Sequence, residues 1–250
     1  MGIVNFIGNM TRDQVAAVAD SAIAVVPIGS TEQHGAHLPL LTDSLICEAV
    51  TREAISLLDI ESPIVIAPLL PIGSSNHHLF ACTVSLSANT YIQVLRDICT
   101  SLATSGFRRL VFVNGHGGND LPMRLVCNDV ILDTDITVGA CSYWTLTSVL
   151  PDPPITPLDH AGTYETALIM HIAGDLVGTP DPRLGDKDAF FDLVLSPGFL
   201  VNRHDEWSRI GGVTGPADGA SAELGRRILA DRAAAVAEVL RQFDLATKTE

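Results

Sequence analysis

The chain between residues 109 and 132 reads RLVFVNGHGGNDLPMRLVCNDVIL, and it combines three successive patterns. The Leu-Val-Phe-Val run after Arg109 is short, apolar and typical of a buried strand. A glycine-rich turn follows, and Asp120 with Pro122 then marks the start of a helix, because acidic caps and first-turn prolines favour helix N-termini. A strand, a tight turn and a helix in direct succession predict the repeating unit of an α/β protein.

The same alternation continues on both sides of this stretch. Strands are predicted over residues 22–27, 63–70, 109–113 and 136–143, and helices over residues 43–58, 89–105, 120–132, 163–172 and 220–243, with Asn89 and Asp120 as N-caps. This alternation favours a mostly parallel central sheet covered by helices on both faces, a three-layer α/β/α fold. Right-handed crossovers then place the loops after the strands along one edge, where such proteins build their sites. Residues 146–158 are predicted to form a loop, and residues 174–219 lack a clear period.

The bulk composition suits one domain over residues 1–250, without a repeat or a linker that would divide it. Hydrophobic residues make up 47% of the chain and charged residues 18%, which is typical of a protein with a sizeable core. The net charge of −14 would repel nucleic acid and anionic membranes, so neither is expected as a partner. The sequence has no signal-peptide pattern and no uncharged apolar stretch of about 20 residues, which favours a cytoplasmic protein.

The five cysteines show no CxxC spacing and indicate free thiols in a reducing compartment. Four of them lie in apolar runs and are predicted to be buried, namely Cys47, Cys99, Cys127 and Cys141. Cys82 lies near a candidate loop, so its burial is left open.

The first cluster of chemically active residues is PIGSTEQHGAHLPLLTD, residues 27–43. In an extended loop, Glu32 and His34 at positions i and i+2 point the same way, and Asp43 meets them if the loop curls back. Two carboxylates and an imidazole are suitable ligands for zinc or manganese. The alternative is a polar surface loop. His37 is expected to have a structural or supporting role.

The second cluster is the turn NGHGGN, residues 114–119. Glycine-rich turns at helix N-termini can bind phosphate, which is one interpretation. However, the spacing matches neither GxGxxG nor GxxxxGK[ST], and there is no lysine, so a dinucleotide site is disfavoured. His116 at the sheet edge would instead complete a metal site.

The third cluster is DHAGTYET, residues 159–166. Glu165 near a helix start could simply cap that helix, and His160 alone could be a buried, hydrogen-bonded imidazole. Together they can supply a metal ligand and an acid–base group to one cleft. His77 and His78 follow the second predicted strand on the same edge, where substrate contact is expected. His171 is expected in the core, and the last two candidates, His204 and Trp207, in surface packing.

In this order, the motifs GSTEQHGxHLPLxTD, NGHxxN and HxGxxET resemble those of the creatininase family. The resemblance extends from about residue 22 to residue 172, with a looser match over residues 211–229. It implies a single α/β/α domain, assembly as a homohexamer, two divalent metal ions per subunit (Zn, Mn or Fe) and hydrolysis of amide-type bonds. Carried over by residue, Asp43 would bridge both ions. Glu32 and His116 would hold one ion, and His34 and Glu165 the other.

The resemblance also implies a mechanism. A water between the two ions would have its pKa lowered to about 7 and attack a carbonyl carbon as hydroxide. His160 would shuttle the proton to the leaving nitrogen. Glu165 is expected to take part in catalysis as well as in metal binding. The residues expected to contact a small amide substrate are Trp144, Gly117, Gly118, His78 and Tyr164.

The chain departs from the creatinine-hydrolysing members at two positions. Gly118 stands where they have a glutamate, and Thr156 where they have a tryptophan, so the resemblance does not imply creatinine as the substrate. The expected reaction is hydrolysis of a small cyclic or linear amide. The alternatives are a lactone or cyclic ketone hydrolase, a deformylase, a peptidase of the mycofactocin-maturation type, a non-catalytic metal-binding protein and a nucleotide-binding protein. Ser30 is not expected to be a nucleophile, since there is no GxSxG elbow.

Overall fold

The computed structural model describes residues 4–153, 159–181 and 201–248. Its centre is a five-stranded sheet in the order β1-β3-β2-β4-β5, in which every neighbouring pair is parallel. The strands are β1 (Val4–Phe6), β2 (Ile23–Ile28), β3 (Ile64–Ile66), β4 (Arg109–Asn114) and β5 (Thr137–Ser142). The predicted parallel sheet is therefore confirmed, with β2 at its centre between β3 and β4.

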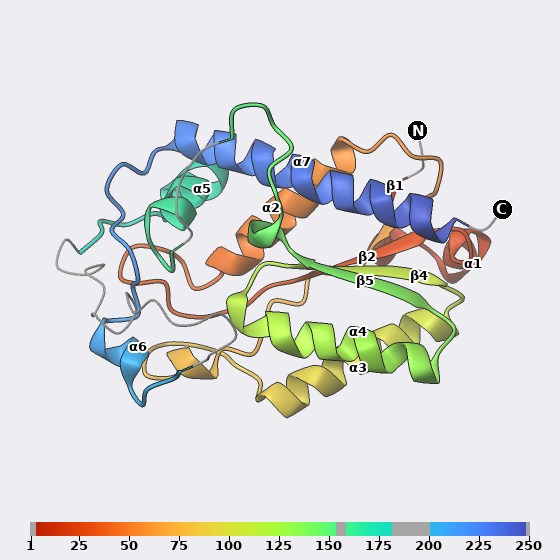
Figure 1. Cartoon of the computed structure of the whole chain (residues 1–250), viewed down its shortest axis with the longest axis horizontal. Coiled ribbons are helices and arrows are strands. Elements are labelled where there is room, and N and C mark those ends of the chain that lie inside the picture. The colour runs from red at the N-terminus through yellow and green to blue at the C-terminus, as the bar shows by residue number, and fades with distance from the viewer. Residues whose placement is uncertain (1–3, 154–158, 182–200, 249–250) are drawn as a thin grey trace.

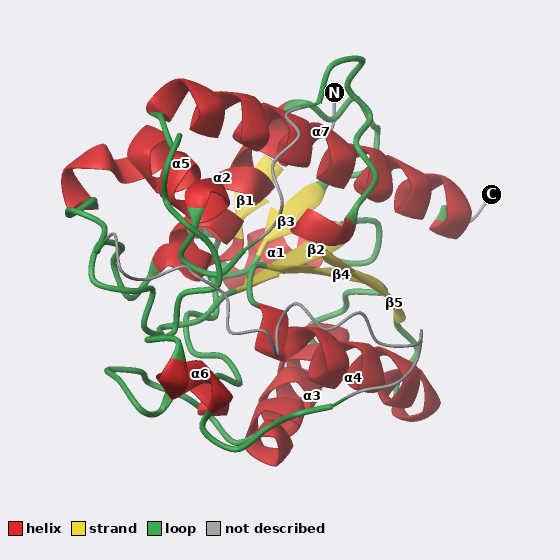
Figure 2. Ribbon diagram, turned by 60° about the vertical axis from the view of Figure 1, so that its left-hand side comes forward, coloured by secondary structure: helices red, strands yellow, loops and turns green. Residues whose placement is uncertain are grey.

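Helices cover both faces of this sheet, as Figures 1 and 2 show. One face carries α2 (Thr42–Ser56), α5 (Thr163–Ala173) and α7 (Ala222–Thr247), and the other carries α3 (Ala88–Thr104) and α4 (Asp120–Asp133). Alternate residues of β2 point into two separate cores, with Ile23 and Val25 on the first side and Ala24 and Val26 on the second. This alternation is the period of a strand buried on both faces, so the three-layer α/β/α prediction is confirmed.

Two short elements at the N-terminus lie outside the sequence prediction. Strand β1 has only three residues and pairs with β3 at the sheet edge, which is too short for a recognisable period. Helix α1 (Arg12–Val18) begins with a capping box in which Thr11 accepts from the Gln14 N–H and the Gln14 side chain accepts from the Thr11 N–H. Both elements lie at the start of the chain, away from the residues with predicted chemistry.

The predicted helix caps need correction. Ser87, not Asn89, caps α3, and its hydroxyl accepts from the Thr90 N–H at 3.3 Å. Asp120 is the first residue of α4 and has helical backbone angles, so it lies inside the helix and not at the cap position, and its carboxylate is bound by Arg124 and Ser142. The position of a polar side chain relative to the first helical residue decides whether it can cap the helix.

The remaining differences are in length and coverage. Strand β3 is shorter than the predicted 63–70, and α7 begins after its cap Ser221 and continues to Thr247. Thr156 lies outside the described residues, so the structure does not describe the position at which creatinine-hydrolysing members have a tryptophan. Within the described ranges, no helix is both long and apolar enough to cross a membrane.

Candidate metal centre

The loop after β2 curls back on itself, which is the condition under which Asp43 is expected from the sequence to meet Glu32 and His34. The Glu32 N–H donates to the Leu40 carbonyl at 2.9 Å, and the Ser44 hydroxyl donates to the Ser30 carbonyl at 2.8 Å. Gly29 permits this closure, since a Cβ there would lie 2.5 Å from the Ser44 hydroxyl oxygen. Asp43, in the first turn of α2, is thereby returned to the residues at the start of the loop.

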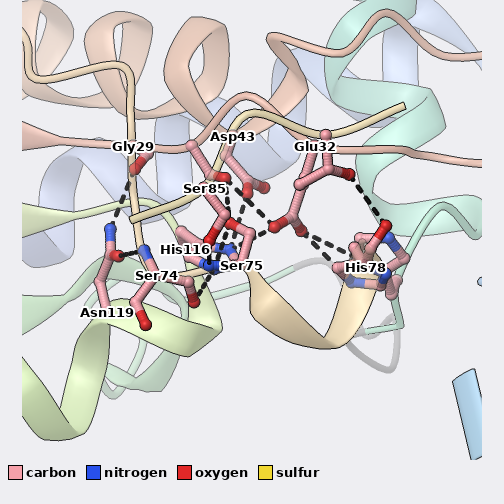
Figure 3. A network of polar contacts seen from close by, with 12 residues as sticks. Gly29, Glu32, Asp43, Ser74, Ser75, His78, Ser85, His116 and Asn119 are labelled. Atoms are coloured by element: carbon pink, nitrogen blue, oxygen red, sulfur yellow. Dashed lines mark hydrogen bonds and ion pairs between the residues drawn. The ribbon is translucent and has the colours of Figure 1, made fainter. Parts of the chain in front are cut away.

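Asp43 lies between two histidines, one from the loop after β2 and one from the loop after β4. Its Oδ1 is 3.2 Å from Nε2 of His34, and its Oδ2 is 2.9 Å from Nδ1 of His116. The same ring nitrogen of each histidine also faces a second carboxylate. Oε2 of Glu165 is 3.6 Å from His34, and Oε2 of Glu32 is 3.3 Å from His116. All five residues are at most 7% exposed, and Figure 3 shows the Glu32–Asp43–His116 part.

Asparagines of the NGHGGN turn hold His116 in this position. The Asn114 side chain accepts from the His116 N–H at 2.9 Å and donates to the His116 carbonyl at 2.8 Å. The Asn119 side chain donates to the Gly29 carbonyl and accepts from the Ser74 N–H, both at 3.0 Å (Figure 3). Asn119 therefore joins the loops after β2, β3 and β4, a role that its sequence motif alone did not reveal.

The ring nitrogens of His116 have separate tasks. Nε2 lies 3.2 Å from the Ser74 carbonyl and 3.1 Å from the Ser75 hydroxyl. The carbonyl can only accept, so the proton resides on Nε2 when His116 is neutral. Nδ1 then presents its lone pair to Glu32 and Asp43, which is the arrangement of a metal-ligating histidine held by an outer hydrogen bond.

Gln33 fixes the tautomer of a second histidine, His78. Its side-chain oxygen accepts from the Gly35 N–H at 3.0 Å, so its nitrogen is the atom that donates to the Gly212 carbonyl at 3.0 Å. The second N–H of that nitrogen donates to Nδ1 of His78 at 2.8 Å. Since Nδ1 accepts, the proton of His78 is on Nε2, 3.5 Å from Oε1 of Glu32.

The backbone of Gln33 orients His160 in the opposite way. Nε2 of His160 donates to the Gln33 carbonyl at 3.0 Å. Its 3.1 Å contact with the Gln33 side-chain nitrogen is not a hydrogen bond, because both N–H groups of that nitrogen are already used. Nδ1 of His160 therefore carries the lone pair, 3.8 Å from Oε1 of Glu32.

The charges of the site explain its protonation. Burial alone would lower the pKa of His34, but the Asp43 and Glu165 carboxylates raise it to about 10. The pKa of His116 is raised well above its ordinary value by Glu32 and Asp43 against the effect of burial. Burial, together with the charge of Asp43, raises the pKa of Glu165 to about 8. Protons thus supply the positive charge that these carboxylates require.

His160 titrates in the opposite direction. Burial and the neighbouring charge of His34 lower the pKa of His160 to about 3, so it is a neutral imidazole. Oε1 of Glu32 and Nε2 of His78 are buried and make no hydrogen bond within the described part of the chain. A buried carboxylate oxygen without a hydrogen bond is costly, and carboxylate and imidazole atoms converging on one point suit a divalent cation. The described residues fit a metal centre.

The metal centre opens into a cavity of about 300 Å³. Four of the predicted substrate contacts line it, namely Trp144, Gly117, Gly118 and His78. Tyr164 does not line it and is packed in the core on the α7 side of the sheet. Consecutive helical residues point about 100° apart, so Glu165 on the cavity side turns Tyr164 away from it.

Trp207 is a cavity residue that sequence reasoning placed in surface packing. It lies on the four-residue helix α6 (Glu206–Arg209), and its ring centre is 5.2 Å from that of His77, 4.7 Å from His78 and 5.6 Å from His160. A neighbouring groove of about 760 Å³ shares Trp207, His77 and Gly118 with the cavity. Residues 174–219 show no clear hydrophobic period, so the sequence could not indicate that Trp207 forms part of the cavity wall.

Two further histidines and the cysteines complete the comparison with the sequence predictions. His37 is buried and bonded through Nε2 to the Thr166 hydroxyl at 2.9 Å, which supports its structural role. His171 is exposed on α5, so its prediction as a core residue is wrong. Cys47, Cys99 and Cys141 are buried, Cys127 is partly buried and Cys82 is exposed.

Comparisons with known proteins indicate the family of this chain. The creatininase family model, described as creatinine amidohydrolase, matches residues 8–240. The mycofactocin precursor peptide peptidase of Mycobacterium tuberculosis is 34% identical over 235 residues, covering 91% of this chain and 87% of that protein. The creatinine amidohydrolase of Pseudomonas putida is 29% identical over 199 residues, covering 69% and 73%.

A solved structure of a substituted creatininase of the Zn–Zn type has a TM-score of 0.73 and 26% identity, with 95% of this chain and 97% of that chain covered. The matched length, the fold and the clusters of side chains that could hold a metal ion agree with this family. The chain is therefore a metal-dependent hydrolase of carbon–nitrogen bonds, and it belongs to the creatininase family.

Proposed function

We propose that the chain holds two divalent ions on either side of Asp43 and hydrolyses a linear amide bond of the peptide type. The observation that carries this proposal is the position of Asp43, whose two oxygens face two different histidines. A carboxylate that offers one oxygen to each side is suited to bridging two ions. In this proposal, Glu32 and His116 complete one ligand set, and His34 and Glu165 complete the other.

Divalent ions at these positions, zinc as in the related structure or manganese or iron, would lower the pKa of a water molecule and polarise the substrate carbonyl. The protein supplies the proton transfer. His160 is neutral and presents the lone pair of Nδ1 on the side of Glu32, while its Nε2–H is held by the Gln33 carbonyl. His160 accepts a proton from the attacking water at Nδ1 and passes it to the leaving nitrogen.

The remaining cavity residues bind and shield the substrate. The N–H groups of Gly117 and Gly118 at the cavity wall can donate to a polar substrate group, and Trp144 and Trp207 supply apolar walls. These rings exclude water from the leaving nitrogen and so strengthen the electrostatic interactions in the site.

Two observations favour a peptide over a small cyclic amide. The cavity of about 300 Å³ continues at Trp207 into a groove of about 760 Å³, which offers room for a chain on one side of the scissile bond. The relatives named as mycofactocin precursor peptide peptidases match 91% or more of this chain at 31–34% identity. A small amide, a lactone and a cyclic ketone are the competing substrates. The homohexamer, the single domain and the cytoplasmic location stay predictions.

The test is a substrate panel assayed with metal-free protein and with protein reloaded with zinc or manganese. The panel contains a linear peptide, a formamide, creatinine, a lactone and a cyclic ketone. We expect peptide cleavage that disappears with the metals and returns on reloading. His160→Ala should retain both ions and lose about 100- to 10,000-fold in kcat, the range for loss of a general acid–base group. Activity of the metal-free protein, or turnover confined to the lactone or ketone, would contradict the proposal.

A further inference from the structure

His77 lies next to the Glu32–His116 half of the metal centre, although no motif assigns it a role there. It is part of the 3-10 turn η2 (Asn76–His78), in the loop after β3. Its ring is parallel to that of His116, with 5° between the planes and 5.8 Å between the ring centres. One donor atom each of Glu32, His77 and His116 lie within 4.8 Å of one another, which is close enough for one ion to contact all three.

Gly118 makes this position available to His77. A Cβ at residue 118 would lie 2.6 Å from Nε2 of His116, 2.1 Å from the Ser74 carbonyl oxygen and 3.2 Å from Cε1 of His77. Any side chain there would collide with the two imidazoles or with the backbone that supports them. Residue 118 is one of the two positions at which the chain departs from the creatinine-hydrolysing members. The glycine at this position leaves room for the imidazole of His77, which comes from the loop after β3.

The His77 ring is held by neighbours on both sides. The ring of His78 is 4.2 Å away and that of Trp207 is 5.2 Å away, measured between centres. The backbone turn is closed by the His78 N–H, which donates to the Ser75 carbonyl at 3.0 Å. A histidine with only a surface role would not need this support, whereas a metal ligand requires a fixed direction.

We propose that His77 is a direct ligand of the ion held by Glu32 and His116. This inference rests on the proposed dinuclear function and adds to it an unequal pair of ligand sets. The Glu32 side of Asp43 then has two imidazoles, and the Glu165 side has one. Imidazole suits zinc, while carboxylates suit manganese, so the Glu32 side is the more selective for zinc.

The experiment compares the wild-type protein with His77→Ala, His77→Asp and a control, His171→Ala, which removes an exposed histidine on α5. Zinc content and zinc affinity are measured by elemental analysis and by competition with a chromophoric chelator. Since even the outer partners of metal ligands contribute roughly 10- to 100-fold in affinity, His77→Ala should weaken one of the two zinc sites by about 100-fold or more. The second site and the control should be unchanged.

Two further readouts separate a ligand from a structural residue. His77→Asp should restore binding at the weakened site and shift its preference towards manganese, because a carboxylate replaces an imidazole. The visible spectrum of the cobalt-substituted protein should change in His77→Ala and stay the same in His171→Ala. Thermal unfolding of the metal-free variants, which should match the wild type, shows that the exposed side chain is not needed for folding.

The outcomes distinguish this inference from the proposed function. If the wild-type protein binds fewer than two ions, the dinuclear function fails, and the assignment of His77 fails with it. If the wild-type protein binds two ions and His77→Ala binds both with unchanged affinity and spectrum, only the assignment of His77 is overturned. A raised KM for the peptide in that second case would make His77 a substrate contact.

Discussion

The two sides of Asp43 differ in how they are enclosed. On one side, His34 in the loop after β2 and Glu165 on helix α5 are both buried. On the other, Glu32 and His116 are buried, but the neighbouring His77 is exposed and three loops meet at a glycine-rich turn. Both sides reach the cavity, the first through Glu165 and the second through Glu32 and His116, but the second is also bordered by the exposed imidazole of His77. We call these the sealed side and the open side.

The supports of the two sides differ as well. Oε2 of Glu165 accepts from the Ala161 N–H at 2.7 Å, and Ala161 has a φ of 57°, a left-handed conformation that costs energy for a residue other than glycine. The open side is held by asparagine amides that join separate loops. The carboxylate of Glu165 is thus held by a strained residue in the loop before its own helix, whereas the imidazole of His116 is held by amides, one of which joins separate loops.

The largest effect is expected when Asp43, the residue that the two proposed ligand sets share, loses its charge. Asp43→Asn takes the shared negative charge from both ligand sets, so we expect the affinity for each ion to fall by more than about 100-fold. Amide hydrolysis should disappear with the ions. Elemental analysis and peptide assays measure the two effects, with Asp135→Asn as a control for an exposed acid. Retention of one tightly bound ion would show that Asp43 serves only one side.

A change confined to the sealed side should remove one of the two ions and leave the other bound. Glu165→Gln keeps the size of the side chain and removes its charge, so the ion beside His34 should be lost while the open side keeps its ion. We expect one zinc equivalent in place of two, with affinity at the lost site reduced by about 100-fold. Zinc titration monitored by a competing chelator measures this. Loss of both ions would mean that the two sides do not bind independently.

Much of this arrangement could be predicted from sequence, because its main features are local. The apolar runs of β2, β4 and β5 mark the sheet, and the strand-end rule brings Glu32, His34 and His116 to one edge. Trp207 could not be predicted, because it follows a stretch without a period and reaches the site only through tertiary contacts. The role of Gln33 depends on a carbonyl 179 residues away, at Gly212, which no local pattern reveals.

The two sides should also release different numbers of protons when they bind metal ions. In the metal-free protein near pH 7, the pKa values of His34 (about 10) and Glu165 (about 8) leave two protons on the sealed side. On the open side, the raised pKa of His116 leaves one proton. The pKa of Glu32 is lowered, chiefly by His116 acting against burial, and the pKa of His77 is lowered because its ring is partly removed from water by its neighbours.

Each proton that an ion must displace makes affinity rise about tenfold per pH unit below the relevant pKa. Between pH 6 and pH 7, zinc affinity should therefore rise about 100-fold on the sealed side and about tenfold on the open side. Calorimetry in buffers of different ionisation enthalpy counts the protons directly. Equal proton release at the two sites would contradict the assignment of two titrating ligands to the sealed side.

The smallest expected effect concerns the orientation of the histidines on the open side. Gln33→Met keeps the length of the side chain but removes the donor to Nδ1 of His78, and it leaves the backbone carbonyl that holds His160 in place. His78 then loses its tautomer preference, while His160 retains the Nε2–H form. Nitrogen NMR of the histidine rings should show a mixture of tautomers at His78 alone. We expect kcat to fall by about tenfold, a loss comparable to one neutral hydrogen bond, with both ions retained.

Gln93→Met, on the exposed surface of α3, is the matched control. A tautomer change at His160 instead would show that the Gln33 side chain, and not its carbonyl, orients the proton shuttle.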